Sequence, residues 1–195
     1  MPSEQLDIVL DHLRAVAAST AVAASAVPPP GGRRGGLAAL RRMTEMFGAA
    51  HPSCGRLATT VTPVDVAGVP GEWHTTPTSD PARRLLYLHG GGWMAGSLSS
   101  HRSLVSNVAA ASGWATLAVD YRLAPEHPFP AGLDDCLSSY QWLRANGPDG
   151  AGPASSTAIA GDSAGGNLTL ATLLALRERG EPLPNAAVAI SPVTD

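Results

Sequence analysis

Short apolar runs alternate with helix-length segments over the second half of the chain. The runs of strand length are residues 84–89, 114–120, 157–161 and 186–191. Helical segments separate them, at residues 101–112, 133–146 and 163–179. Because residues 85–88 and 115–119 are almost continuously apolar, we expect strands that are buried on both faces. The alternation predicts an α/β fold, with a mostly parallel sheet flanked by helices and joined by right-handed crossovers.

The first third of the chain lacks this alternation and is patterned as helix. Apolar residues recur at helical spacing at Leu6, Val9, Leu10, Leu13 and Val16. A stretch rich in Pro and Gly at residues 27–36 separates this helix from a second one, predicted at residues 37–49. We therefore expect an N-terminal helical cap or lid at residues 1–55 and an α/β core at residues 56–195. The core should begin with two strands, at 59–66 and 71–76, joined by a turn at residues 68–71.

The composition argues against several kinds of partner. The chain has 195 residues and a formal net charge of -3, and its basic residues are scattered, so no nucleic-acid partner is expected. No apolar run is long enough to span a bilayer. Glu4, Asp7 and Asp11 precede the apolar residues 15–27, where a secretory signal would carry positive charge.

The two cysteines, Cys54 and Cys136, lie far apart in the sequence. They have no metal-ligand spacing, and two cysteines do not make a disulfide framework. We expect free thiols, no metal site and a cytoplasmic location.

A serine stands between small residues in Gly161-Asp-Ser-Ala-Gly165, where a predicted strand meets a predicted helix. The spacing is that of the nucleophile elbow, a strained turn that exposes a serine hydroxyl above the strand ends. The N-terminus of the helix would direct amide N–H groups toward developing negative charge. Taken alone, the pattern also fits a glycine-rich helix start in which Asp162 or Ser163 is only an N-cap.

A second glycine cluster, His89-Gly-Gly-Gly-Trp93, follows the strand at residues 84–88. Acyl transfer needs two or three N–H donors aimed at one oxygen, and glycines let the backbone approach that oxygen without a Cβ in the way. We expect the amides of Gly91, Gly92 and Ala164 to form this oxyanion hole. Alone the cluster would be a flexible turn, but together the two motifs favour a serine hydrolase with Ser163 as nucleophile.

Three stretches resemble the hormone-sensitive lipase-like family of α/β-hydrolases, which includes bacterial carboxylesterases. They are His89-Gly-Gly-Gly-Trp93, Asp120-Tyr-Arg-Leu-Ala-Pro-Glu-His-Pro-Phe-Pro-Ala131 and Gly161-Asp-Ser-Ala-Gly-Gly-Asn167. The closing Ser191-Pro-Val-Thr-Asp195 is also similar to this family. The resemblance implies an α/β-hydrolase fold, an acyl-enzyme on Ser163, esters of short to medium acyl chains as substrates, and no cofactor.

The same resemblance assigns supporting roles to other residues. His89 would brace the oxyanion loop rather than act as a base, and Asp162 would support the nucleophile. The segment 120–127 would be structural, with Arg122 and Glu126 as partners in a buried network. A homo-oligomer of the full-length protein would be compatible with the family.

The chain departs from the family pattern after the nucleophile. A triad in this fold runs Ser, then Asp or Glu, then His. No histidine follows Ser163, and the only later carboxylates are Glu178, Glu181 and Asp195. We do not expect a histidine upstream of Ser163 to replace the triad base, because each has another expected position in the fold. These histidines are His12, His51, His74, His89, His101 and His127.

We therefore expect the chain to be the N-terminal portion of such an enzyme, truncated at the C-terminal side of the sheet. It would be nearly inactive alone, because loss of the triad histidine costs on the order of 10⁶ in kcat. A non-catalytic protein that binds a small ligand on the same scaffold is the alternative. An amidase or an acyltransferase would share the acyl-enzyme chemistry.

Overall fold

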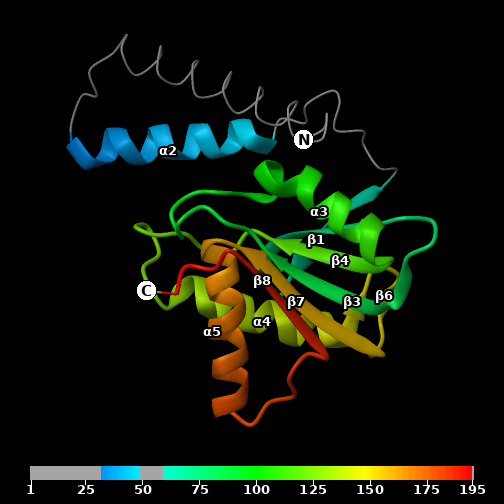
Figure 1. Ribbon diagram of the computed structural model, residues 1–195. Helices are drawn as coiled ribbons and strands as arrows, with labels where there is room; N and C mark the ends of the chain where they lie inside the picture. Colours follow the sequence, from blue (N-terminus) through cyan, green and yellow to red (C-terminus); the bar gives the residue numbers. More distant parts are fainter. Residues whose placement is uncertain (1–31, 49–58, 195) are drawn as a thin grey trace, which may run out of the picture.

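A computed structural model describes residues 32–48 and 59–194, and its core is a six-stranded sheet (Figure 1). The strands lie in the order β1-β2-β4-β3-β7-β8. Their bounds are β1 Thr60–Val66, β2 Val69–Thr75, β3 Asp80–Leu88, β4 Trp114–Val119, β7 Ser156–Asp162 and β8 Ala186–Ile190. β4, β3, β7 and β8 run parallel to one another, whereas β1 and β2 are antiparallel additions. The predicted α/β class and mostly parallel sheet are confirmed.

Helices cover both faces of this sheet (Figure 1). α3 (Leu98–Ser112) packs on one face, where Val105 meets Leu85 and Tyr87 of β3 in one buried cluster. α4 (Ala131–Ala145) and α5 (Ala164–Glu178) cover the other face. The larger cluster there joins the helices to β3, β4 and β7; it includes Leu86, Leu117, Leu137, Leu143, Ile159, Leu168 and Leu176. Apolar residues on both faces of the central strands therefore hold three layers together.

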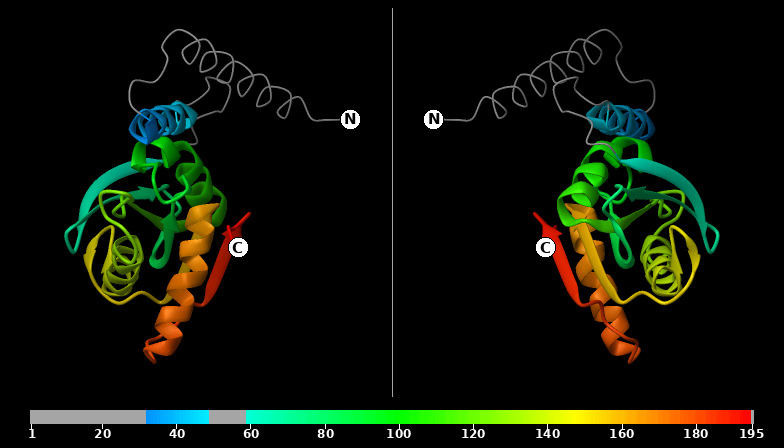
Figure 2. Two further views of the ribbon diagram at one scale, coloured as in Figure 1. Left: turned by 90° about the vertical axis from the view of Figure 1, so that its left-hand side faces the viewer. Right: turned by 90° about the vertical axis from the view of Figure 1, so that its right-hand side faces the viewer.

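α2 (Gly32–Gly48) lies apart from the sheet and packs against α3 (Figures 1 and 2). A second N-terminal helix was expected at residues 37–49, but α2 already begins at Gly32. The predicted loop therefore ends earlier, because the glycines at 35 and 36 continue the helix rather than break it. The other predicted helix, near residues 6–16, lies outside the described residues.

Two local predictions need correction. The β1–β2 turn is Ala67-Gly68 rather than residues 68–71, because both residues have positive φ and Asp65 Oδ1 accepts a hydrogen bond from the Gly68 amide. Val69 and Pro70 consequently belong to β2. The short hairpin β5 (Asn146–Gly147) and β6 (Gly150–Ala151) after α4 was not anticipated.

Candidate active site

Ser163 lies in the turn between β7 and α5, with φ 52 and ψ -117. This left-handed conformation is unusual for a residue with a side chain and costs on the order of 1–3 kcal/mol. The Ser163 amide donates to the Ile190 carbonyl at 2.8 Å, and the Ser163 carbonyl accepts from the Asn167 amide at 3.0 Å. The turn is therefore fixed by β8 and by α5, and it leaves the serine side chain partly exposed.

The small residues around Ser163 are required by close backbone packing. A Cβ on Gly165 would overlap the carbonyl oxygen of Leu88, at the end of β3. A Cβ on Gly161 would meet the carbonyl of Gly165 and that of Leu88. The predicted need for small flanking residues is confirmed, and its cause is the approach of α5 to the end of β3.

The glycine cluster forms the loop that leaves β3, next to this turn. Gly91 has φ 129 and Gly92 has φ 63, and a Cβ on Gly91 would overlap the Ala95 carbonyl. The amides of Met94 and Ala95 close the loop by donating to the Gly91 carbonyl. No described residue accepts a hydrogen bond from the amides of Gly91, Gly92 or Ala164. These amides are the donors that the sequence predicted for an oxyanion, and that role stays a prediction.

Asp162 joins the glycine loop to the serine turn. Its Oδ1 accepts hydrogen bonds from the Tyr87 hydroxyl at 2.9 Å and from the Gly90 amide at 3.1 Å. Its Oδ2 lies 3.5 Å from His101 Nε2 on α3. Burial raises the pKa of Asp162, but the contacts with His101, Tyr87 and Gly90 outweigh burial and lower it below its usual value. The carboxylate thus ties β3, the glycine loop and α3 to the residue before Ser163.

His89 lies beneath the loop as a buried, neutral side chain. Its Nδ1 is 2.8 Å from the Gly90 carbonyl, which can only accept, so Nδ1 carries the proton. The ring stacks on Tyr121 at 4.3 Å, and the Tyr121 hydroxyl donates to the His89 carbonyl at 2.7 Å. Burial lowers the pKa of His89 to about 4. This arrangement suits a brace and does not suit a base at neutral pH.

The expected pairing of Arg122 with Glu126 in a buried network is wrong. Arg122 binds Asp135 of α4 through Nε and Nη2, and its backbone amide also donates to Asp135. Glu126 is exposed and instead pairs with Arg41 of α2. Asp135 lies in α4, the helix that follows the segment of Arg122. No spacing in the sequence indicated that the Asp135 carboxylate would contact Arg122.

No described histidine contacts the Ser163 hydroxyl. His74 is fully buried against Ser106, His89 lies beneath the loop, His101 faces Asp162, and His127 is exposed. His12, His51 and Asp195 lie outside the described residues. Of the later carboxylates, Glu178 is exposed at the end of α5 and Glu181 accepts from Gln141. The described residues therefore bring the predicted nucleophile close to the glycine loop of the predicted amide donors, and no described histidine lies in contact with the Ser163 hydroxyl.

Sequence reasoning missed the side chains that support the site from beneath. Tyr87 lies outside the three motifs, and Tyr121 lies inside the segment 120–131 without an assigned role; their contacts follow from the register that brings β3 beside β4 and β7. His101 was placed at a helix start, but its contact with Asp162 could not be read from a separation of 61 residues.

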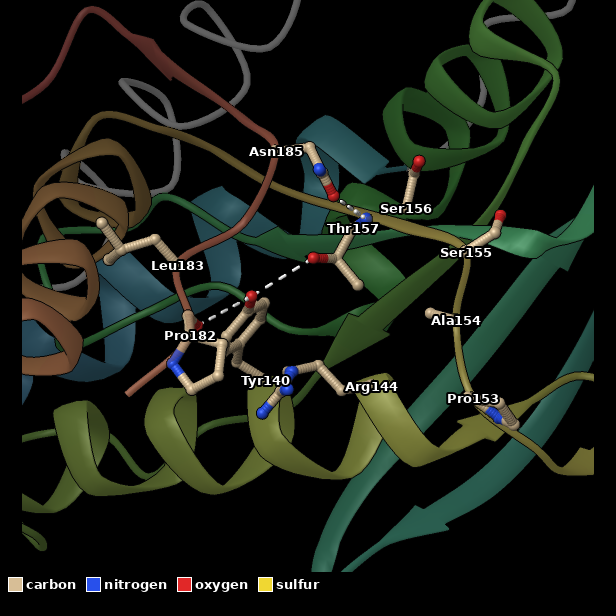
Figure 3. A pocket seen from close by; sticks show the side chains of 10 residues that line it. All are labelled: Tyr140, Arg144, Pro153, Ala154, Ser155, Ser156, Thr157, Pro182, Leu183 and Asn185. Atoms are coloured by element: carbon tan, nitrogen blue, oxygen red, sulfur yellow. Dashed lines mark hydrogen bonds between the residues drawn. The ribbon is translucent and has the colours of Figure 1, made fainter. Parts of the chain in front are cut away.

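A pocket of about 240 Å³ lies at the opposite end of the strands from Ser163, near the start of β7 (Figure 3). Tyr140, Arg144 and Thr157 are among its lining residues. Six residues of strand separate Thr157 from Ser163, which is roughly 20 Å at 3.3 Å per residue. The pocket is therefore too far from Ser163 to bind the reacting bond of a substrate.

Among the described residues, no helix has the length and apolarity that crossing a membrane requires. No group of three His, Cys, Asp or Glu side chains in this part of the chain could hold a metal ion. Cys136 is a buried free thiol, and burial raises its pKa; Cys54 lies outside the described residues.

Known proteins with a related sequence are ester hydrolases. An acetyl-hydrolase of Streptomyces hygroscopicus is 46% identical over 132 residues, which is 68% of this chain and 42% of that protein. An ethyl acetate hydrolase of Pseudomonas putida is 42% identical over 133 residues, covering 65% of this chain and 41% of that protein. The chain thus spans less than half the length of these relatives.

Solved structures with a similar fold also include esterases. The crystal structure of an esterase from the bacterial hormone-sensitive lipase (HSL) family matches with a TM-score of 0.79 and 40% sequence identity, over 100% of this chain and 59% of that one. The predicted resemblance to this family is confirmed. The family model described as alpha/beta hydrolase fold matches residues 85–195, which include the glycine loop and Ser163. The chain belongs to the α/β-hydrolase fold family.

Proposed function

We propose that the protein hydrolyses carboxylic esters through an acyl-enzyme on Ser163. The observation that carries the proposal is the left-handed Ser163 at the end of β7, beside a glycine loop in which the amides of Gly91 and Gly92 have no acceptor among the described residues. Two such donors near a developing oxyanion are each worth about 10²- to 10³-fold in rate. The related acetyl-hydrolase and ethyl acetate hydrolase support short acyl groups as the substrate class.

In the proposed mechanism the Ser163 hydroxyl attacks the ester carbonyl. Gly91, Gly92 and Ala164 would donate to the oxyanion, while Asp162 and His89 hold the loop that carries two of these amides. The proton of Ser163 must go to a base, and no described histidine is in contact with the hydroxyl. We expect the 195 residues alone to turn over esters poorly, because loss of the triad histidine costs on the order of 10⁶ in kcat.

The experiment supplies the base from outside. p-Nitrophenyl acetate hydrolysis is measured for the 195-residue polypeptide and for its Ser163→Ala variant, each with and without added imidazole. A second comparison uses a polypeptide extended at its C-terminus by a segment that contains an Asp and a His. We expect an imidazole-dependent rate that requires Ser163, and a much faster rate in the extended polypeptide. Equal rates for the serine and alanine forms under every condition would contradict the proposal.

A non-catalytic protein that binds a small ligand is the second candidate. One observation favours it: no described histidine contacts Ser163. Binding of an ester analogue that survives Ser163→Ala, together with no acylation of the wild type, would support this candidate. Amidase or acyltransferase use of the same serine, a homo-oligomer and a cytoplasmic location stay predictions.

A further inference from the structure

Arg41 of α2 reaches two loops beside the candidate site. Its Nε donates to the Met94 carbonyl at 2.8 Å. Its Nη1 and Nη2 donate to the two carboxylate oxygens of Glu126 at 2.9 and 2.7 Å, and Nη2 also donates to the Ala124 carbonyl at 3.3 Å. Four hydrogen bonds therefore use most of the five N–H groups of the guanidinium.

These acceptors belong to the segments that shape the site. Met94 lies in the turn that Gly91 closes, directly after the predicted oxyanion donors. Ala124 and Glu126 lie in the segment before α4, and the Ala124 amide already donates to the Trp93 carbonyl at 2.9 Å. Arg41 thus contacts Ala124 itself and Met94, the residue after Trp93, at the point where the two loops already meet.

We propose that Arg41 is a positioning residue that clamps the glycine loop against the segment 120–131 and so keeps the amides of Gly91 and Gly92 in place. The last link, that these amides serve an oxyanion, rests on the proposed ester hydrolysis. The clamp itself does not depend on that function.

The exposure of the ion pair supports a local rather than a global role. The side chains of Arg41 and Glu126 are 36% and 52% exposed. Pairs exposed to this degree contribute little to overall stability. The contacts with the Met94 and Ala124 carbonyls differ from the ion pair, because each of them holds one loop at one point. The planar fork of the Arg41 guanidinium can donate to both carbonyls while it also binds the Glu126 carboxylate. A lysine has no such fork.

Glu45, one turn further along α2, provides a matched comparison. Its Oε1 accepts from the Ser97 hydroxyl at 2.8 Å, at the start of α3. Glu45 therefore helps to dock α2 without touching Met94 or Ala124. Arg42 is exposed on the same helix and serves as a control for the loss of charge.

The test is amide hydrogen exchange, read by mass spectrometry on the 195-residue polypeptide and on Arg41→Gln, Arg41→Lys, Glu45→Ala and Arg42→Gln. Loss of the Met94 carbonyl contact should raise exchange across residues 91–97 by about fivefold in Arg41→Gln, which corresponds to the roughly 1 kcal/mol of one hydrogen bond. Arg41→Lys should fall between this variant and the wild type. Glu45→Ala should raise exchange in α2 and at the start of α3 only, and Arg42→Gln should raise it in neither loop.

Two results would overturn the proposal. One is unchanged exchange across residues 91–97 in Arg41→Gln. The other is an equal increase there in Glu45→Ala, which would mean that Arg41 acts only by keeping α2 docked. If the wild type is not acylated at Ser163, the proposed function fails, whereas the exchange result still decides whether Arg41 holds the loop.

Discussion

Gly165 shows how strictly single residues constrain the serine turn. A Cβ at this position would overlap the Leu88 carbonyl, which belongs to a central strand and cannot move freely. The requirement is steric and concerns folding as much as chemistry. A five-residue motif could therefore be recognised in the sequence because each of its small residues answers a packing constraint.

Gly165→Ala should lower the free energy of unfolding by about 3 kcal/mol, at the upper end of what overpacking costs. Gly152→Ala is the control, because a Cβ there meets nothing within 4 Å and its φ is not positive. Urea unfolding measures both. Equal stability of the two variants would mean that α5 does not press on the end of β3.

Two buried histidines should make stability depend on pH. Burial lowers the pKa of His74 and of His89 to about 4, from an ordinary value of 6.5. Between these values the unfolded chain binds protons that the folded chain does not, so stability is full above pH 6.5 and is lost as pH falls toward 4. The loss should reach about 3 kcal/mol for each histidine.

Urea unfolding between pH 7.5 and pH 4.5 measures this dependence. His74→Gln should flatten the slope between about pH 6.5 and 4, because one of the two titrating groups is gone. His127→Gln, at an exposed position, is the matched histidine substitution outside the core. A slope unaffected by His74→Gln would contradict the burial of a neutral imidazole.

The side-chain hydrogen-bond partners around the site could not be predicted from the sequence. The two motifs were enough to predict where the backbone turns at Gly91, Gly92, Ser163 and Ala164, because these turns require small residues in a fixed local order. Pairs such as Arg122 with Asp135 depend on how a helix returns to the sheet. The packing of a helix against the sheet does not produce a sequence pattern that identifies such a pair.

At the scale of elements, α3 has the most completely defined start. Ser97 is its N-cap: its hydroxyl accepts from the Ser100 amide, and the Ser100 hydroxyl accepts from the Ser97 amide, which makes a capping box. The Ser97 hydroxyl also donates to Glu45 of α2. The start of α3 therefore links the helix to the element that covers it.

Ser97→Ala should lower the free energy of unfolding by about 1 kcal/mol, the usual cost of losing an N-cap. Ser99→Ala, at an exposed position in the first turn, should be neutral or slightly stabilising, because alanine has the higher helix propensity. Thermal and urea unfolding of both variants test the difference. Equal stabilities would argue that water replaces the cap without loss.

Strand and helix order was largely predictable, because buried parallel strands and amphipathic helices have distinct periods. The boundaries of the helices and strands were harder to predict. α2 begins at Gly32 and the β1–β2 turn spans only Ala67-Gly68, since hydrogen bonds and packing outweigh the local preference of Gly and Pro. The hairpin of β5 and β6 is too short to have a sequence signature.

At the scale of the whole molecule, β8 is one edge of the sheet and is mostly exposed. Val188 is 53% exposed and Ile190 is 42% exposed. α5 and the loop after it also expose apolar side chains, with Leu174 49% and Leu183 51% exposed. An open apolar edge of this kind favours pairing between chains.

Val188→Lys should therefore reduce self-association of the 195-residue polypeptide, because a charge on an edge strand opposes edge-to-edge pairing. Thr62→Lys is the matched control, since it adds the same charge to β1 at the other edge. Sedimentation velocity over a range of concentrations compares the two. An equal reduction by both would point to net charge rather than to the β8 edge.

The central claim is that Ser163 is a nucleophile served by the glycine loop, and acylation tests it most directly. The 195-residue polypeptide is incubated with p-nitrophenyl acetate, and its peptides are analysed by mass spectrometry. Because no described histidine contacts Ser163, the water attack that releases the acetyl group should also be slow, and acetyl should accumulate on the peptide that contains Ser163. Gly91→Ala should reduce the rate of accumulation, because its Cβ would displace the loop at the Ala95 carbonyl. Acetylation confined to other residues, or spread equally over exposed serines such as Ser99, would contradict the account.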